Sequence, residues 1–444
     1  MNKRKPGWAI AIGLTAFNFL HAQETKPVTL NEAIELSIKN SKQLKSSQAK
    51  IEEATAILKQ SVQKRLPDVN VTGSYLRLSS GNIDLKTKSN NNSGGSQGST
   101  PKIDQAVYGL INASLPIYAG GRISYGIESS KYLEQAAELD AENDKDEVIQ
   151  NTIEAFSNLF KAGSAVRLVK ENLAQSQERT RELSNLEKNG LLARNDLLKA
   201  ELQTSNTELN LLDAENNLQL ANVNMDLMLG LPINATLVLD TTGIEKKNDT
   251  RTFEDFLQAA LTNRKDAAAL DYRKKAAETG VKSIKGEKFP SLQLTGGYIA
   301  ADIPKFLSIT NTVNIGVGVS YNIGSLWKNK AKELEAQARV SELSAGEAMI
   351  NDNIQRQVSS DYLSLVSRRK KIEVYAKAME QANENYRIIK NKFDNNLATT
   401  SDLLDADAAK LQANLAFTLT KADAFVAYHK LLQTAGLLAN EIKK

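Results

Sequence analysis

The chain carries the same sequence pattern twice, and this duplication limits its possible folds more than any single motif does. A shift of 223 positions aligns Pro67 with Pro290, and a shift of 206 positions aligns Asp196 with Asp402. The other residues that match at the second shift are Leu191, Leu197, Leu198 and Ala200 with Leu397, Leu403, Leu404 and Ala406. Matches at many positions with one insertion indicate a tandem duplication. We therefore expect two equivalent halves rather than two unrelated domains.

The repeat also predicts where the chain divides. The two shifts differ by 17 positions, so the first copy contains an insertion between Tyr75 and Ser114. The inserted segment is rich in Ser, Asn and Gly, a composition typical of an exposed loop. The expected divisions are a signal peptide over residues 1–22, a first repeat over 23–231, a linker or equatorial region over 232–251, a second repeat over 252–437 and a C-terminal tail over 438–444.

The first 22 residues have the composition of a secretory signal peptide. Lys3, Arg4 and Lys5 precede the apolar stretch Ala9–Leu20, and Ala22 is a small residue suited to cleavage. The apolar stretch has 12 residues, which is too short to cross a bilayer as a helix. An N-terminal anchor that stays in place is the alternative. We expect cleavage and export, without a lipid anchor, because the chain has no cysteine.

Composition argues against enzyme chemistry. Cysteine is absent and histidine occurs only at His21 and His429, which excludes disulfides, thiol catalysis and zinc ribbons. The 56 Lys and Arg nearly balance the 52 Asp and Glu, so the charge does not predict nucleic-acid binding. Gly120-Gly121 is not followed by Lys-Ser/Thr and is therefore not a phosphate-binding loop. We expect no catalytic residue, no metal and no cofactor.

Each copy has the same order of elements: a helix that ends at a proline, two strands, and two long helices. The expected helices cover Leu30–Arg65, Ile123–Lys188, Asn195–Leu229, Phe253–Lys288, Leu326–Asp394 and Ser401–Ala435. The expected strands cover 69–75, 107–115, 292–298 and 313–320, where apolar and polar residues alternate. In the long helices apolar residues recur at spacings of three and four, which predicts antiparallel coiled-coil hairpins.

The strands have one apolar and one polar face, the pattern of membrane-barrel strands. A small soluble sheet with one buried face is the alternative. About eight strands are needed to close a barrel, so four strands per chain require several chains. The polar residues expected to line a water-filled pore are Asn70, Thr72, Asn112, Ser114, Gln293, Thr295, Asn314 and Ser320.

This duplicated layout, together with four local segments, resembles the TolC-like outer membrane factors, also called outer membrane efflux proteins. Ser114–Arg122 resembles the family's strand-to-helix junction, and Ser320–Trp327 is a degenerate second version. The hairpin turns Lys188–Ala200 and Asp394–Ala409 resemble each other and the family's turns. The resemblance covers essentially the whole chain after the signal peptide. It implies the exit duct of a tripartite efflux pump or type I secretion system.

The resemblance further implies a mainly α fold with a membrane β part. Three identical chains would form a 12-stranded outer-membrane β-barrel continuous with a periplasmic α-helical coiled-coil barrel. The implied partners are a periplasmic adaptor (membrane fusion) protein, an inner-membrane transporter of the RND, ABC or MFS type, and outer-membrane lipid, with no nucleic acid. A periplasmic coiled-coil adaptor and a structural or adhesin rod are alternatives, but neither explains two hairpins combined with two strand pairs.

An acidic pair begins the last long helix. Asp402 and Asp405 are three residues apart and share a helix face, whereas Asp407 points well away from them. By resemblance this pair matches the aspartates that narrow the family's tunnel entrance. Three chains would then bring six carboxylates together, which raises their pKa values and favours cations. The alternative is an ordinary acidic first turn, which the helix dipole stabilises.

Only one hairpin can supply both carboxylates. The first copy keeps Asp196 but has Lys199 where Asp405 falls. Relatives often hold the closed entrance with an arginine, and the matching position here is Ala398. We therefore expect closure to depend more on packing around Phe393.

The two hairpin turns are the expected adaptor-docking tips. Gly190 permits a backbone with positive φ, and apolar residues at a turn need a partner to cover them. The residues assigned to docking are Gly190, Leu191, Leu192, Asn396 and Leu397. The alternative is that the leucines pack only against the helices of their own hairpin.

Overall fold

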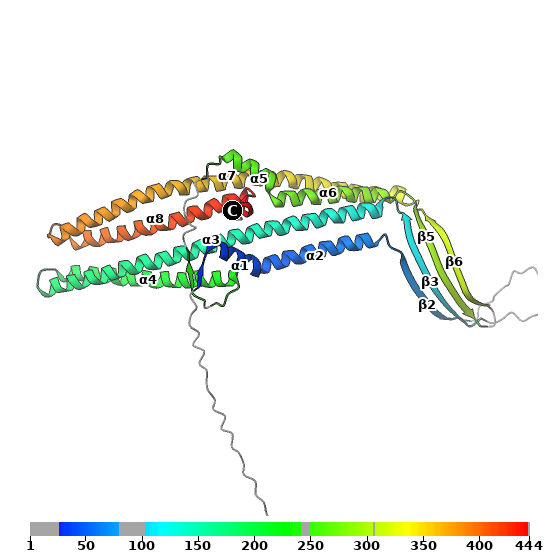
Figure 1. Cartoon of the computed structure of the whole chain (residues 1–444), viewed down its shortest axis with the longest axis horizontal. Coiled ribbons are helices and arrows are strands. Elements are labelled where there is room, and N and C mark those ends of the chain that lie inside the picture. The colour runs from blue at the N-terminus through cyan, green and yellow to red at the C-terminus, as the bar shows by residue number, and fades with distance from the viewer. Residues whose placement is uncertain (1–25, 80–102, 234, 241–248, 305–306, 443–444) are drawn as a thin grey trace, which may run out of the picture. The chain divides into compact units, whose positions relative to one another are not determined.

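The computed structural model describes residues 26–79, 103–233, 235–240, 249–304 and 307–442 (Figure 1). The expected signal peptide, residues 1–22, and most of the inserted loop, residues 80–102, lie outside the described residues. Among the helices that are described, none is long and apolar enough to cross a membrane.

The described chain is mainly helical. The helices are α1 Leu30–Asn40, α2 Lys42–Gln63, α3 Arg122–Lys188, α4 Arg194–Leu229, α5 Phe253–Asn263, α6 Lys265–Gly286, α7 Ser325–Asp394, α8 Thr400–Thr434 and α9 Leu438–Ile442. The strands are β1 Lys26–Val28, β2 Asp68–Arg77, β3 Gln105–Tyr118, β4 Leu237–Leu239, β5 Ser291–Ile303 and β6 Leu307–Ser320. The four long helices and the four long strands confirm the order predicted from the sequence, and α3 and α7 have 67 and 70 residues.

The first helix of each repeat is not continuous, contrary to expectation. Each breaks at the same repeat position, after Asn40 and after Asn263. The Asn40 side chain donates a hydrogen bond to the carbonyl oxygen of Leu229 at 2.6 Å. There Gly230, with φ +70, ends α4 so close to Asn40 that no Cβ would fit. Gly436 meets Asn263 in the same way. The break is thus associated with a contact to a distant helix end, which local sequence does not reveal.

The long strands form one antiparallel sheet in the order β2-β3-β5-β6. Its register pairs Val71 with Ile111 on one face and Asn70 with Asn112 on the other. The apolar face is bare: Val71 is 76% exposed and Ile315 82% exposed. The eight polar residues expected to share a face all lie on the opposite one. The predicted two-faced sheet is therefore confirmed.

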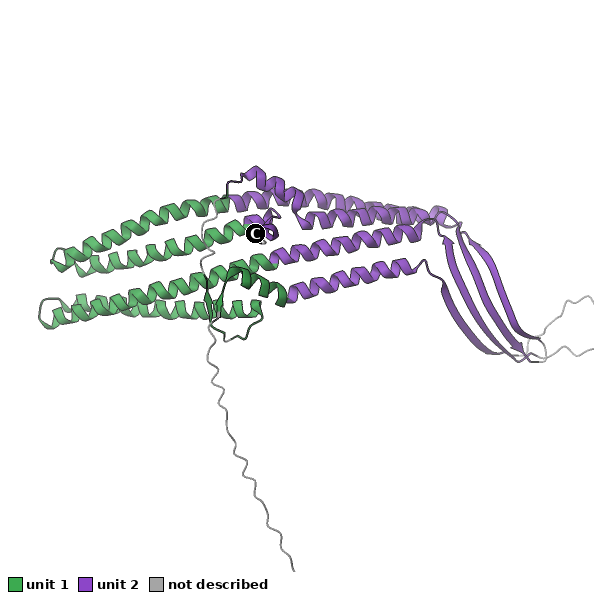
Figure 2. Ribbon diagram, in the orientation of Figure 1, with its two compact units in different colours: residues 1–41, 148–249, 363–430 green, residues 42–147, 250–362, 431–444 purple. Residues whose placement is uncertain are grey.

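Contacts divide the chain into two compact units (Figure 2). Unit 1 comprises residues 1–41, 148–249 and 363–430, and unit 2 comprises residues 42–147, 250–362 and 431–444. The boundaries fall inside α3, α7 and α8 as well as between elements, so each unit contains parts of both repeats. Unit 1 contains the hairpin turns, and unit 2 contains the four-stranded sheet.

Unit 1 has a core beside a small sheet that sequence reasoning missed. Strands β1 and β4 pair in parallel, and β4 lies within residues 232–251, the expected linker or equatorial region. Val28 of β1 and Leu237 of β4 pack with Phe156, Met225 and Leu229. Three-residue strands are too short to show alternation, so their pairing depends on this packing. The expected C-terminal tail likewise contains a short helix, α9.

Candidate functional site

The candidate site lies in unit 1, where α3 turns into α4 and α7 turns into α8. Gly190 has φ +73, and Asn396, which matches it in the second repeat, has φ +60. Both helices end with the same backbone bond: Leu191 N donates to Leu186 O at 2.8 Å, and Leu397 N donates to Lys392 O at 2.7 Å. Asn is among the few residues other than Gly that tolerate this left-handed backbone. The two turns are thus structurally equivalent.

The leucines of the turns divide into exposed and packed residues. Leu191 and Leu397 are 73% and 76% exposed, as a docking role requires. Leu192 instead packs against a cluster built on buried Leu183, Leu197 and Ala200. Leu192 is half-buried rather than exposed, and its assignment to the docking surface stays a prediction. Phe393 and Leu404 join the same cluster, and closure of the entrance by packing around Phe393 stays a prediction.

Asp402, in the first turn of α8, forms an N-terminal cap together with Thr399. Its Oδ2 accepts hydrogen bonds from the Thr399 backbone N at 2.9 Å and from Thr399 Oγ1 at 2.7 Å. Asp402 N donates in return to Thr399 Oγ1 at 3.1 Å, which completes a capping box. The hydrogen bonds from Thr399, first from its backbone and then from its side chain, lower the pKa of Asp402. Within one chain the carboxylate is therefore stabilised as a cap.

Asp405 is the less constrained acid of the pair. Its side chain is exposed on the same helix face and makes no hydrogen bond or ion pair with any other described residue. Asp196 does have a partner: Lys199 Nζ lies 3.2 Å from its Oδ1 and 3.1 Å from Ser401 Oγ. Lys199 thus compensates the charge of Asp196 and links α4 to the first turn of α8.

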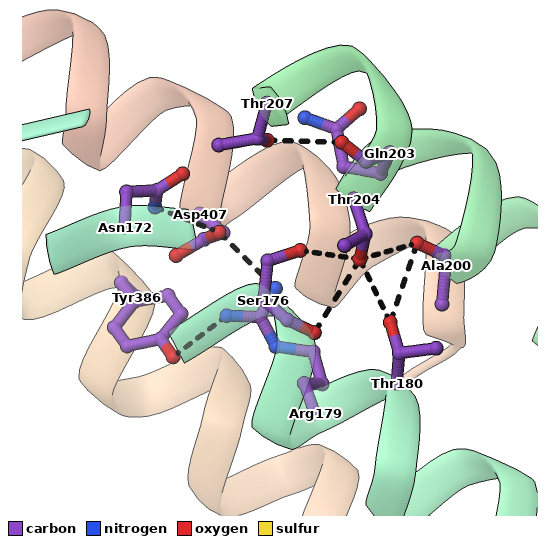
Figure 3. Close-up of polar contacts among 10 residues, drawn as sticks. All are labelled: Asn172, Ser176, Arg179, Thr180, Ala200, Gln203, Thr204, Thr207, Tyr386 and Asp407. Carbon is purple, nitrogen blue, oxygen red and sulfur yellow. Dashed lines mark hydrogen bonds and ion pairs between the residues drawn. The ribbon is translucent and has the colours of Figure 1, made fainter. Parts of the chain in front are cut away.

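A buried ion pair between the hairpins was not predicted (Figure 3). Arg179 Nη1 of α3 lies 3.1 Å from Asp407 Oδ2 of α8, and their side chains are only 8% and 3% exposed. Asn172 Nδ2 donates to the same oxygen at 3.1 Å, and Arg179 Nη2 donates to the Tyr386 hydroxyl at 3.3 Å. Burial lowers the pKa of Arg179, but the hydrogen bond and charge of Asp407 outweigh it, so the pKa is raised.

A weak signal for this pair exists in the sequence. Asp407 lies four residues after buried Leu403 and thus on an inward face of α8. A charge there requires a partner. The partner is 228 positions away, and nothing in the local sequence identifies it.

The contact between α3 and α4 near Arg179 is also polar (Figure 3). The Ser176 and Thr204 hydroxyls lie 2.9 Å apart, and those of Thr180 and Thr204 lie 2.8 Å apart. Thr204 also donates to the Ala200 carbonyl at 3.0 Å. Buried polar layers of this kind fix the register of coiled coils. Among the described residues, no group of His, Asp or Glu is placed to hold a metal ion.

Comparison with known proteins finds similarity to outer membrane efflux proteins. Residues 33–231 match the family described as outer membrane efflux protein. The outer membrane efflux protein BepC of Brucella suis biovar 1 (strain 1330) is 22% identical over 425 residues, which cover 94% of this chain and 87% of BepC.

Two solved structures have the same fold. The outer membrane protein VceC of Vibrio cholerae matches with a TM-score of 0.75 and 18% identity over 92% of this chain and 96% of VceC. The CmeC outer membrane channel of Campylobacter jejuni matches with a TM-score of 0.75 and 18% identity over 100% of this chain and 96% of CmeC. The family match over residues 33–231, the relative and the fold agree, and all three show that the chain is similar to outer membrane efflux proteins.

Proposed function

We propose that three copies of this chain form the outer-membrane exit duct of a tripartite efflux pump or type I secretion system. The observation that carries this proposal is the four-stranded sheet, with one bare apolar face and one polar face, in the same chain as two long helical hairpins. A soluble protein would have to cover the apolar face, whereas lipid does so in a membrane. Three such sheets supply twelve strands, enough to close a barrel.

The polar face of the sheet would line the pore, and the hairpins would form the periplasmic tunnel. Exposed Leu191 and Leu397, with Gly190 and Asn396 shaping the turns, would dock a periplasmic adaptor protein. That adaptor would connect the duct to an inner-membrane transporter of the RND, ABC or MFS type. Residues 1–22 would direct export and be removed, and no lipid anchor is needed. The chain moves substrate without covalent chemistry.

Membrane fractionation combined with electrophoresis tests this proposal. The protein should be recovered in the outer-membrane fraction and migrate as an oligomer that heating converts to monomer. A monomer in the soluble periplasmic fraction would refute the duct and favour a periplasmic adaptor or rod.

A further inference from the structure

We propose that Arg179 and Asp407 are positioning residues: they fix the rotation of α8 about its own axis and thereby present Asp402 and Asp405 at the duct entrance. This inference rests on the proposed function, because the acidic pair matters only if it faces a permeation path. The ion pair between Arg179 and Asp407, called the anchor below, nevertheless forms within one chain.

The anchor is directional and shielded from water. Asp407 Oδ2 receives Arg179 Nη1 and Asn172 Nδ2, each at 3.1 Å, and Tyr386 holds the other end of the guanidinium. Asp407 Oδ1 is buried without a hydrogen-bond partner. If α8 rotated, both buried charges would lose their compensation, which is strongly unfavourable. The ion pair therefore resists rotation of α8 more than apolar contacts would, since those are non-directional.

Helix geometry connects this anchor to the acidic pair. At 3.6 residues per turn, Asp407 projects about 140° away from Asp402 and about 160° away from Asp405. Holding Asp407 inward against α3 therefore turns the other two carboxylates outward. Both are exposed in the structure, whereas Asp407 is buried.

The other contacts near the acidic pair do not supply the same constraint. Asp402 bonds to Thr399 at the start of its own helix, so this cap does not orient α8 relative to α3. The hydrogen bond from Lys199 to Ser401 is solvent-exposed, and Leu404 contributes apolar packing. A second ion pair between α3 and α8, Lys161 with Asp423 at 3.0 Å, is partly exposed and lies farther along α8, where Asp423 also contacts Arg368 of α7 at 3.1 Å. This exposed pair serves as a control.

The absence of cysteine from the chain allows a direct test. A single reporter, Asp405→Cys, is introduced into the full-length oligomer, and its rate of reaction with a charged methanethiosulfonate reagent is measured. The same reporter is then combined with Arg179→Met and Asp407→Leu, which replace the buried pair by apolar side chains without leaving one charge alone.

We expect the reaction to slow several-fold when the pair is replaced, and to stay unchanged in the Asp423→Asn control. An equal rate with and without the pair would overturn the proposal, and so would an equal slowing in the control. If the double replacement does not assemble, Asn172→Leu removes one donor to Asp407 and keeps the ion pair. A smaller slowing is then expected, and an unchanged rate would contradict the anchor.

A second measurement connects the anchor to function. With Asp405 restored, the double replacement should shift the reversal potential of reconstituted channels toward that of the Asp402→Ala/Asp405→Ala variant. A wild-type reversal potential would refute the positioning role. If the wild-type protein forms no channel, the proposed function fails, while the thiol reaction still decides whether the ion pair orients α8.

Discussion

At the scale of single residues, unit 1 contains a second buried carboxylate whose environment differs from that of Asp407. Asp226 of α4 is fully buried and receives one hydrogen bond, from Asn222 Nδ2 at 3.0 Å. Its Oδ1 has no hydrogen-bond partner, and burial raises its pKa. The matching position of the second repeat is buried Leu432. We infer that the buried carboxylate of Asp226 lowers the folding stability of unit 1, whereas the second repeat has an apolar side chain at the matching position.

We predict that Asp226→Leu stabilises the protein at neutral pH by about 1–3 kcal/mol, the cost of a buried unsatisfied polar group. Because the folded-state pKa is raised, the folded state binds the proton more tightly than the unfolded state does. The stability of the wild type should therefore fall as pH rises from the ordinary value of 3.8 through the folded pKa. Thermal unfolding of both proteins between pH 4 and pH 8 (about the range in which most proteins are stable) measures this difference. If the stabilities of the wild type and Asp226→Leu changed in parallel with pH, this prediction would be wrong.

At the scale of elements, the sequence predicts the helices and strands that nearby residues determine. It does not predict features that depend on contacts between distant parts of the chain. The bounds of α3, α4, α7 and α8 follow from their apolar spacing and the lack of proline, and the strands follow from their alternation. The breaks after Asn40 and Asn263 were not predictable, since they involve contacts with Gly230 and Gly436 far along the chain.

The candidate site shows the same division. The tips and the acidic pair come from short local motifs. The structure places the tips in equivalent turns and the acidic pair at the start of α8. The Arg179–Asp407 pair needs two residues 228 positions apart, so periodicity could mark Asp407 as inward but not identify its partner. The division of the chain into two repeats remains a prediction from the sequence.

The junction between β3 and α3 should not tolerate a larger residue. Gly120 has φ +63, and an added Cβ would overlap the carbonyl oxygen of Gly286 in α6. A non-glycine residue in this backbone region costs about 1–2 kcal/mol before any clash. We predict that Gly120→Ala lowers the yield and thermal stability of the oligomer. Gly280→Ala, where nothing lies within 4 Å, is the control in the same helix as Gly286. An equal effect of both variants would show that the close approach is unimportant.

The hairpin tips should govern coupling to a partner rather than assembly. We predict that Leu191→Asp combined with Leu397→Asp abolishes export and leaves the oligomer yield unchanged, because both side chains are exposed. Export by cells that express each variant is the measurement. Asn189→Asp with Asn395→Asp adds the same charge to the same turns without removing a leucine, and should have a smaller effect. Normal export by the leucine variant would reject the docking role.

At the scale of the whole molecule, the acidic pair should set ion selectivity only after three chains assemble. Six carboxylates around one axis would attract cations and bind divalent ions. We predict that Asp402→Ala with Asp405→Ala leaves the oligomer intact and lowers both cation selectivity and block by divalent cations. Unchanged selectivity and block would mean that Asp402 acts only as the helix cap that the structure shows.

The most direct test of the duct is electrical. The oligomer purified from outer membranes is reconstituted into a planar lipid bilayer, and the current is recorded at the single-channel level. We expect discrete, uniform conductance steps that prefer cations, because the polar strand faces and the acidic pair would enclose a continuous aqueous path. A correctly assembled oligomer that inserts into the bilayer but carries no current would contradict this expectation.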